Sequence, residues 1–429
     1  MRVGISGTGF IARGMAGAID ALPEFDLACV LTRRPVMLSA PLFPKARVTN
    51  SIDRLVGSCD VVIECSGDAV HAADVMVAAG EAGLKIVTMN SEAQVTVGTA
   101  LVRRGYAITE AHGDQPGCLA ELDEEARDMC FRPLAYVNLK GFLNHAPTRE
   151  DMLYWSERQG LTLRQVTSFT DGGKLQIEQA LVANALGARI ARQGMIGGTA
   201  TDLSDLDHLA RAARELGAPI SDYVLNPGGP PGVLILAESP LAAAQEGYLP
   251  FTRLLTRGGE AFVLLRPHHL VHLEIGKTLR RLARGMPALL NNGPRPTATV
   301  AAVAKRALPA GTLIEEALGG FELRGEAIEI AGREDTVPIT LLDGARLRHA
   351  LDPGQVVLRG DVDLPETRAA ALYWSSLEPE TPREPTALRA RAWTRSRAWA
   401  HASMSARLPA REAASSAPAC PPAGDGTTA

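Results

Sequence analysis

A lysine and a glutamate lie four residues apart on one face of a predicted helix. Lys174 and Glu178 fall within its apolar stripe, with Asp171 near the helix start and Gln176 and Gln179 on the polar face. A charged pair on an apolar face is costly unless it is partnered or functional. Burial beside a carboxylate also suits a lysine to give a proton to a carbonyl oxygen. We predict catalytic roles for Lys174, Glu178 and Asp171; the alternative is an ion pair at an interface.

A second polar segment begins at Arg266. Pro267 suits the first turn of a helix, which would put His268 and His272 one turn apart. That spacing could bind zinc, but no third ligand follows at a suitable spacing, so we predict no metal. His269 is a candidate proton donor, and Arg266 is a candidate ligand of a phosphate or carboxylate. The alternative for each residue is a polar helix start at the surface.

Three other polar residues are candidate substrate ligands. Lys140 and Asn144 follow a predicted strand, and Asp114 lies in the turn-like segment 112–117. The first two could face a cleft, whereas Asp114 fits a plain turn equally well. With Arg266, these residues form the predicted substrate site.

A glycine-rich turn follows the first predicted strand. Gly7, Gly9 and Ala12 fit the G-x-G-x-x-A pattern. Gly7 permits the tight turn, Gly9 lets the backbone approach a pyrophosphate, and Ala12 lets the helix sit against the sheet. The backbone N–H groups at the helix start, which includes Phe10 and Ile11, can bind phosphates. The pattern predicts a dinucleotide site; the alternative is a glycine turn with no ligand.

The end of the second predicted strand indicates which nucleotide binds. An NAD site has an acid there, but this strand ends Thr32-Arg33-Arg34. Two guanidinium groups suit the 2′-phosphate of NADP by charge and by geometry. We therefore predict NADP, with NAD as the alternative if both arginines are simply solvated.

Polar residues also end two later strands of the same region. Ser66 and Gly67 follow one buried strand, and Asn90 and Glu92 follow the next. Ligands of parallel sheets bind beyond the carboxyl ends of the strands, so we predict that these residues lie on the nicotinamide side of the cofactor. Ser66 or Asn90 could instead cap a helix.

Alternating strands and helices in the first ~120 residues would position these groups. This alternation predicts a doubly wound parallel sheet. From residue 135 onward, strand-like runs mix with long helical segments, which predicts an α+β domain. The expected strands are 2–6, 26–31, 61–63, 85–89, 106–109, 134–139, 232–236 and 261–265, and a helix is expected over 71–83.

The predicted fold class is α/β with four parts. They are a Rossmann domain (1–133), an α+β catalytic and dimerisation domain (134–296), a small β-rich domain (297–376) and a disordered tail (377–429). The tail is rich in Pro, Ala, Ser and Arg, which predicts no packed core. Its arginines interleave with Trp393 and Trp399, as in single-strand nucleic-acid binders, but acids lie nearby. We expect no nucleic-acid partner.

Composition argues against several other classes. The 429 residues are 46% hydrophobic and 21% charged with net charge −4, which is typical of a multidomain globular protein without a charge-driven nucleic-acid or membrane partner. The six cysteines lack paired spacing, which argues against a disulfide framework or a zinc site. No signal segment or bilayer-length apolar run is evident. We expect a cytoplasmic protein.

The order of these motifs resembles that of homoserine-dehydrogenase-like oxidoreductases with a C-terminal SAF domain, a group that includes deoxyxylulose-phosphate reductoisomerase-like enzymes. The resemblance implies an NAD(P)H-dependent reductase that dimerises through its middle domain, and some relatives couple reduction to isomerisation of a sugar phosphate. It extends from residue 1 to about residue 375. The resembling segments are 7–9, 89–93, 113–116, 169–174, 183–185, 231–233 and 266–270, with SAF-like segments at 301–312 and 351–358.

Two departures from that group bear on the substrate. Homoserine dehydrogenases usually have lysine directly after the asparagine that matches Asn90, where this chain has Ser91. The resemblance therefore does not imply homoserine dehydrogenase activity. Relatives also tend to be more basic after the residue matching Lys140, where this chain has Phe142 and Leu143.

The function expected from these features is an NADPH-dependent oxidoreductase acting on a small carbonyl or hydroxy substrate, of the sugar-phosphate or semialdehyde type. Lys174, oriented by Glu178 or Asp171, would protonate the carbonyl oxygen, while Arg266 and Lys140 hold an anionic group. The alternatives are a cyclitol or sugar dehydrogenase and a non-catalytic cofactor sensor. The charged pair on the apolar helix face favours an enzyme.

Overall fold

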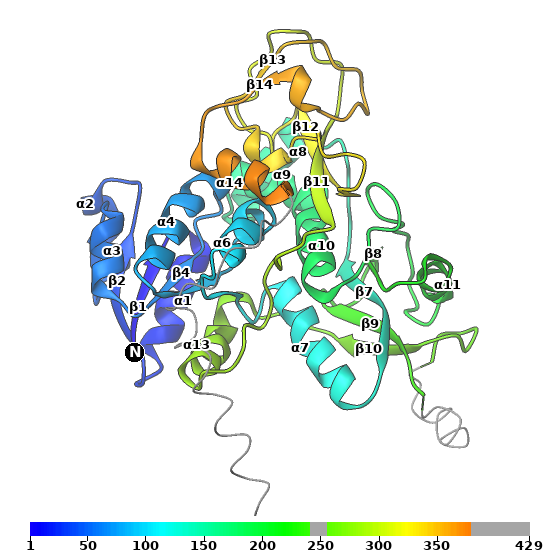
Figure 1. Ribbon diagram of the computed structural model, residues 1–429, viewed down its shortest axis with the longest axis horizontal. Coiled ribbons are helices and arrows are strands. Elements are labelled where there is room, and N and C mark those ends of the chain that lie inside the picture. The colour runs from blue at the N-terminus through cyan, green and yellow to red at the C-terminus, as the bar shows by residue number, and fades with distance from the viewer. Residues whose placement is uncertain (241–254, 379–429) are drawn as a thin grey trace, which may run out of the picture. The chain divides into compact units, whose positions relative to one another are not determined.

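A six-stranded parallel sheet forms the N-terminal part of the computed structural model, which describes residues 1–240 and 255–378 (Figure 1). Its strand order is β3-β2-β1-β4-β5-β6. The first three strands are added toward one edge of the sheet and the last three toward the other, so the order of addition switches between β1 and β4. Ligands of such sheets bind beyond the carboxyl ends of the strands at this switch. The strands are β1 (Arg2–Ser6), β2 (Asp26–Leu31), β3 (Arg47–Thr49), β4 (Val61–Glu64), β5 (Lys85–Thr88) and β6 (Ile108–Glu110).

Two helices of this part begin at polar side chains that lie just beyond strands β4 and β5. The Asp68 carboxylate accepts the N–H groups of Val70 and His71 at the start of α4, and the Asn90 side chain accepts that of Ala93 at the start of α5. The helices are α1 (Phe10–Asp20), α2 (Val36–Ser39), α3 (Ile52–Ser58), α4 (Ala69–Glu81), α5 (Ser91–Ala93), α6 (Thr99–Arg103) and α7 (Gln115–Asp128).

A second, mixed sheet follows, with strand order β10-β9-β7-β8. β7 pairs in parallel with β8, and the other pairs are antiparallel. The strands are β7 (Arg132–Lys140), β8 (Ile220–Leu225), β9 (Val233–Glu238) and β10 (Phe262–Arg266), and the helices are α8 (Arg149–Gln159), α9 (Leu163–Thr170), α10 (Gly173–Leu186), α11 (Asp207–Leu216), the 3₁₀ helix η4 (Val271–Glu274) and α13 (Ile275–Ala283).

Small antiparallel sheets form the last described part. β11 (Ala298–Ala304) pairs with β12 (Leu323–Glu329), and β13 (Arg346–Leu347) pairs with β14 (Val362–Asp363), before α14 (Arg368–Leu377). α10 packs against β7 and β8 and also against β11 and β12 (Figure 1). This helix is therefore shared by the mixed sheet and the last part of the chain.

The predicted α/β class is confirmed, with a parallel sheet followed by a mixed one, but two strands were missed and two local expectations are wrong. β3 and β8 are not predicted, because β3 has three residues and β8 carries Ser-Asp-Tyr among its apolar residues. No helix begins at Pro267; the chain is irregular until η4, since Leu270 N–H donates to Glu274 and Val271 N–H donates to Gly113.

The polar face predicted for α10 is also absent. Gln176 and Gln179 are buried, and their amides bond to backbone atoms: Gln176 to Gly194 and Ala327, Gln179 to Tyr136 and Asp222. The described residues form one compact unit, so the domain limits at 133, 296 and 376 stay predictions. The tail predicted to be disordered begins at residue 377, and all of it after Glu378 lies outside the described residues. Leu377 is the last residue of α14.

Candidate active site

Charged side chains from four elements gather on one side of α10. Lys174 Nζ lies 2.9 Å from Glu92 Oε2, and both side chains are largely buried. Glu178 Oε2 accepts a hydrogen bond from Asn138 Nδ2 at 3.0 Å and lies 3.6 Å from Lys140 Nζ. The structure therefore brings together predicted cofactor, catalytic and substrate residues that are far apart in the sequence. We call Glu92, Asp114, Lys140, Lys174 and Glu178 the charged cluster.

The ion pairs in this cluster differ from the predicted ones. Lys174 pairs with Glu92 rather than with Glu178, because a helical side chain leans toward the helix N-terminus, away from a residue one turn further on. Asp171 pairs instead with Lys305 at 2.7 Å, and its other oxygen accepts the Gly173 N–H. Glu92 is therefore the carboxylate that orients Lys174, whereas Asp171 links the start of α10 to the residue that follows β11.

Asp114 and Lys174 influence each other's protonation. Burial and the Glu178 carboxylate, against the opposing effect of the Lys174 ammonium, raise the pKa of Asp114 to about 6. Burial alone would lower the pKa of Lys174, but Glu92, Asp114 and Glu178 outweigh it and raise that pKa. Lys174 is therefore an ammonium at neutral pH, surrounded by carboxylates.

The raised pKa of Asp114 predicts how stability depends on pH. Unfolded Asp114 titrates at its ordinary, lower pKa, so between that value and pH 6 the folded protein holds the proton more tightly. The stabilisation that comes from this tighter proton binding is present at low pH and is lost as pH rises through about 6. Asp114→Asn should therefore raise the free energy of unfolding by on the order of 2 kcal/mol at pH 7.5 and by much less, under about 1 kcal/mol, at pH 4. Melting temperatures at both pH values test this; an equal effect at both would contradict it.

A chain of amides holds Lys140 beside Glu178. Lys140 Nζ donates to Gln115 Oε1 at 2.6 Å, and Gln115 Nε2 donates to Asn138 Oδ1 at 2.7 Å. Sequence reasoning missed Gln115 and Asn138. Asn138 could have been found as an amide inside an otherwise apolar strand. A buried amide needs hydrogen-bond partners, so its position indicates nearby polar groups.

His269 lies at the edge of the charged cluster. Burial, followed by the charge of Lys140, lowers its pKa, so the ring is neutral at pH 7. Its buried Nδ1 has no hydrogen-bond partner among the described residues. A role in proton transfer stays a prediction for this residue.

The two other predicted substrate residues lie in different surroundings. The Arg266 guanidinium contacts Glu121 and lies 2.6 Å from Glu274. The Arg266 guanidinium, which was predicted to bind a substrate anion, is thus already paired with two carboxylates of the protein. Asn144 is exposed, and its Oδ1 accepts the N–H of Ala146 within a turn. The sequence alone gives no sign of these local partners.

The glycine turn after β1 fits a dinucleotide. Gly7 has φ +126°, and a Cβ there would lie 3.1 Å from the Cys65 carbonyl oxygen. At Gly9, the first residue before α1, a Cβ would meet no atom within 4 Å, and no described side chain caps the helix. The helix start therefore presents free N–H groups to open space, as a pyrophosphate requires, while Ala12 is fully buried. Phe10 is exposed and Ile11 is half-buried at this start.

The two arginines after β2 are not equivalent. Arg33 Nη1 lies 2.5 Å from Asp68 Oδ2, the same carboxylate that caps α4. Arg34 is exposed and makes no ion pair with any described residue. Of the two, Arg34 is the one whose charge is available to a 2′-phosphate.

Ser66 and Asn90 share one partner at the carboxyl ends of β4 and β5. Glu64, which sequence reasoning missed, accepts the Ser66 N–H and hydroxyl and, at 3.3 Å, the Asn90 amide on Oε1. Gly67 follows with φ +72°. Asn90 also caps α5 through Ala93, so its alternative interpretation as a helix cap is correct. The same residue lies at the carboxyl edge of the sheet, where the nicotinamide is predicted.

The described residues form neither a metal site nor a membrane-spanning helix. Within residues 1–240 and 255–378, no group of three or more His, Cys, Asp or Glu side chains is arranged to hold a metal. Over the same residues, no helix combines the length and apolarity needed to span a bilayer.

The buried Asp171–Lys305 pair predicts a large stability effect. The side chains are 0% and 5% exposed, and Lys305 also donates to the Gly320 carbonyl. Lys305→Met should cost about 3–5 kcal/mol, because it leaves a buried carboxylate unpaired. Lys45→Met is the control, since Lys45 is 69% exposed and should matter by less than about 1 kcal/mol. Urea unfolding measures both; equal losses would contradict the assignment.

Two family models match the chain in adjacent segments. Residues 7–113 match the model described as homoserine dehydrogenase, NAD binding domain, and residues 113–275 match oxidoreductase DRL, catalytic domain. The first segment contains the glycine turn, and the second contains α10 with Lys174 and Glu178. The protein is therefore an NAD(P)-dependent oxidoreductase.

Solved structures with a similar arrangement include two enzymes. UDP-N-acetylglucosamine 3-dehydrogenase GnnA from Acidithiobacillus ferrooxidans is 16% identical with a TM-score of 0.39, over 68% of this chain and 92% of that one. Biliverdin reductase from Synechocystis is 14% identical with a TM-score of 0.35, over 68% and 93%. Among curated proteins, none matches the chain. The class assignment rests on the two family models.

Proposed function

We propose that the protein uses NADPH to reduce a small carbonyl substrate, of the sugar-phosphate or semialdehyde type, whose oxygen binds at Lys174. The observation that carries this proposal is the buried Lys174 ammonium within the charged cluster. Glu92 follows β5 and Asp114 follows β6, so Lys174 reaches from α10 to the carboxyl edge of the nucleotide-binding sheet. That edge is where the reactive half of a dinucleotide belongs.

The chemistry follows from the charge on Lys174. Bound reduced nicotinamide supplies a hydride for the carbonyl carbon. Negative charge then develops on the carbonyl oxygen, and an ammonium held in a buried site stabilises it. Lys174 gives up its proton even with a raised pKa, because an alkoxide is a stronger base than an amine. Glu92, at 2.9 Å, holds Nζ in place.

The remaining cluster suits the rest of a hydroxylated substrate. Lys140 offers a cation with a side chain 25% exposed, whereas Arg266 already has two carboxylate partners. We therefore assign the anionic or hydroxyl groups of the substrate to Lys140. A second candidate function is a cyclitol or sugar dehydrogenase, in which substrate hydroxyls would replace some of the hydrogen bonds that Glu178, Asn138 and Gln115 make with one another.

A substrate screen tests this function. NADPH oxidation is followed with phosphorylated ketoses and semialdehydes, and NADP⁺ reduction with cyclitols and sugars. Turnover of one class identifies the reaction type. Binding of nucleotide without turnover of any class would favour a cofactor-sensing protein instead.

We infer NADPH preference from Arg34, whose charge has no acidic partner among the described residues. Arg34→Ala should weaken NADPH binding about tenfold and leave NADH binding unchanged, since only the phosphate contact is lost. Arg33→Ala should act more weakly, because Asp68 already engages Arg33. Fluorescence titration with both nucleotides measures this; an equal loss for NADH would contradict the inference.

We further propose that the protein is a homodimer formed through its middle part, that residues 297–376 are a SAF domain and that reduction is coupled to isomerisation in the manner of the reductoisomerase-like group. The small antiparallel sheets β11–β12 and β13–β14 are compatible with the second point. Light scattering after size exclusion tests the first: twice the mass of one chain is expected, and the mass of one chain would contradict it.

A further inference from the structure

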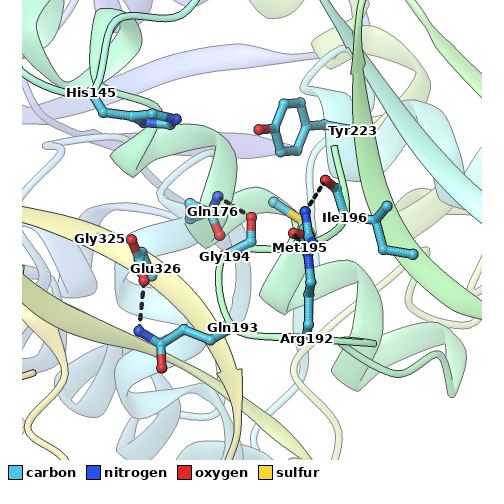
Figure 2. A pocket seen from close by; sticks show the side chains of 10 residues that line it. All are labelled: His145, Gln176, Arg192, Gln193, Gly194, Met195, Ile196, Tyr223, Gly325 and Glu326. Atoms are coloured by element: carbon cyan, nitrogen blue, oxygen red, sulfur yellow. Dashed lines mark hydrogen bonds between the residues drawn. The ribbon is translucent and has the colours of Figure 1, made fainter. Parts of the chain in front are cut away.

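A cavity of about 340 Å³ lies beside α10, between the loop at residues 192–196, β8 and β12 (Figure 2). Gln176 lines it, two residues after Lys174, which places it about 160° around the helix axis from Lys174 and Glu178. None of the charged cluster lines this cavity. It is therefore a separate space on the other side of the helix that carries the catalytic lysine.

The loop that borders the cavity is held in an unusual conformation. Met195 is buried and has φ +69°, a left-handed conformation that is strained for a non-glycine residue. Buried Asp222 fixes the loop by accepting the N–H groups of Ile196 at 2.9 Å and Gly197 at 2.8 Å. Arg192 Nε and Nη2 donate to the carbonyls of Met195 and Ile196. These contacts orient the Arg192 guanidinium before any ligand arrives.

Three polar groups at the cavity keep unused hydrogen-bonding capacity. Arg192 forms no ion pair with a described residue and keeps Nη1 unbonded to any of them. The Tyr223 hydroxyl likewise has no described partner. His145 Nδ1–H donates to the Asp171 carbonyl at 3.1 Å, which leaves Nε2 as an acceptor. Figure 2 shows His145 and Tyr223 together at one side of the cavity.

The lining carries one guanidinium, that of Arg192, and one carboxylate, that of Glu326. Glu326 is the acid in the lining, but it pairs with Arg324 and accepts from Gln193 at 2.7 Å. Arg192 therefore does not pair with Glu326 and keeps Nη1 available to a ligand, although its charge also interacts with the buried Asp222 carboxylate. A guanidinium and a phenol hydroxyl that line the same cavity can both donate to an oxyanion, and an imidazole nitrogen that carries no proton accepts from a hydroxyl group.

We propose that this cavity is a second ligand site, for a small hydroxylated molecule that carries a carboxylate or phosphate group. Arg192 and Tyr223 bind the oxyanion, and His145 accepts a hydroxyl of the same molecule. The volume lies within the range of small-molecule sites. This site does not depend on which carbonyl is reduced at Lys174.

Calorimetric titration of the full chain with inorganic phosphate, and separately with citrate, tests the site. Arg192→Gln should weaken binding of the preferred probe at least about tenfold, and Tyr223→Phe by about three- to tenfold. Arg306→Gln is the matched control, because Arg306 pairs with Glu322 and does not line the cavity. Phosphate bound at the glycine turn is unaffected by these substitutions, so the difference between variants isolates the cavity.

The two probes also separate the two sources of the oxyanion. Tighter binding of phosphate identifies a phosphorylated ligand, and tighter binding of citrate a carboxylate. If Arg192→Gln does not fold, Tyr223→Phe decides, because phenylalanine keeps the ring that packs on Gly197. Absence of binding to wild type, or binding that Tyr223→Phe and Arg192→Gln leave unchanged, would overturn the proposal.

Discussion

Lys174→Met is expected to lower turnover at least about 100-fold while nucleotide binding stays within about threefold of wild type. The ammonium acts on charge that appears only as the hydride is transferred, so its removal affects the reaction rather than cofactor binding. Lys174 also lies 2.9 Å from Glu92, at the carboxyl edge of the nucleotide-binding sheet, and away from the glycine turn that would bind the pyrophosphate.

Three other variants make this result interpretable. Lys45→Met is the control for loss of a lysine far from the cluster, and it should retain full activity. Lys174→Arg keeps the charge and should keep more activity than Lys174→Met. Because Lys174→Met leaves buried carboxylates uncompensated, the pair Lys174→Met with Glu92→Gln covers the case in which the single variant does not fold. Full turnover by folded Lys174→Met would refute the assigned role.

Gly9→Ala should weaken nucleotide binding about tenfold or more and leave the melting temperature unchanged. Gly9 has an ordinary φ of −75°, and an added Cβ would meet no atom within 4 Å, so the folded protein tolerates alanine. The methyl group would instead occupy the space in which a pyrophosphate approaches the backbone. Loss of binding without loss of stability is the expected signature.

Two neighbouring glycines provide the comparison. Gly17→Ala, in the same helix and also without atoms near its added Cβ, should bind nucleotide normally and gain about 0.5–1 kcal/mol. Gly7→Ala should lose stability as well as binding, because its φ is +126° and the Cys65 carbonyl lies 3.1 Å from the added Cβ. Fluorescence titration and thermal unfolding measure both quantities. Normal nucleotide affinity in Gly9→Ala would contradict the assigned site.

The nucleotide-binding half could be read from the sequence because its signals are local. A strand, a glycine turn and a helix follow one another at residues 2–20, and in that order the spacing of Gly7, Gly9 and Ala12 predicts a dinucleotide-binding turn. The short strand β3 lacks such a signal, since three residues show no periodicity. The strand β8 was not predicted because it contains buried polar residues, whose hydrogen-bond partners lie elsewhere in the chain.

The site itself was only partly predictable, because its ion pairs join distant segments. The apolar surroundings of Lys174 and Glu178 mark them as unusual, but nothing local selects Glu92 and Lys140 as their partners. The helix expected at Pro267 does not form because of hydrogen bonds that the sequence pattern does not show. Contacts with Gly113 and Glu274 satisfy the backbone there and override the preference of proline for a helix start.

The most direct test of the account is a crystal structure of the protein with NADP⁺ bound. The account predicts that the pyrophosphate contacts the start of α1 at Gly9 and that the nicotinamide ring lies beside Asn90, facing the Lys174 side chain. A nicotinamide ring placed away from the charged cluster, with Lys174 out of its reach, would contradict the role of Lys174 even if the nucleotide occupies the glycine turn.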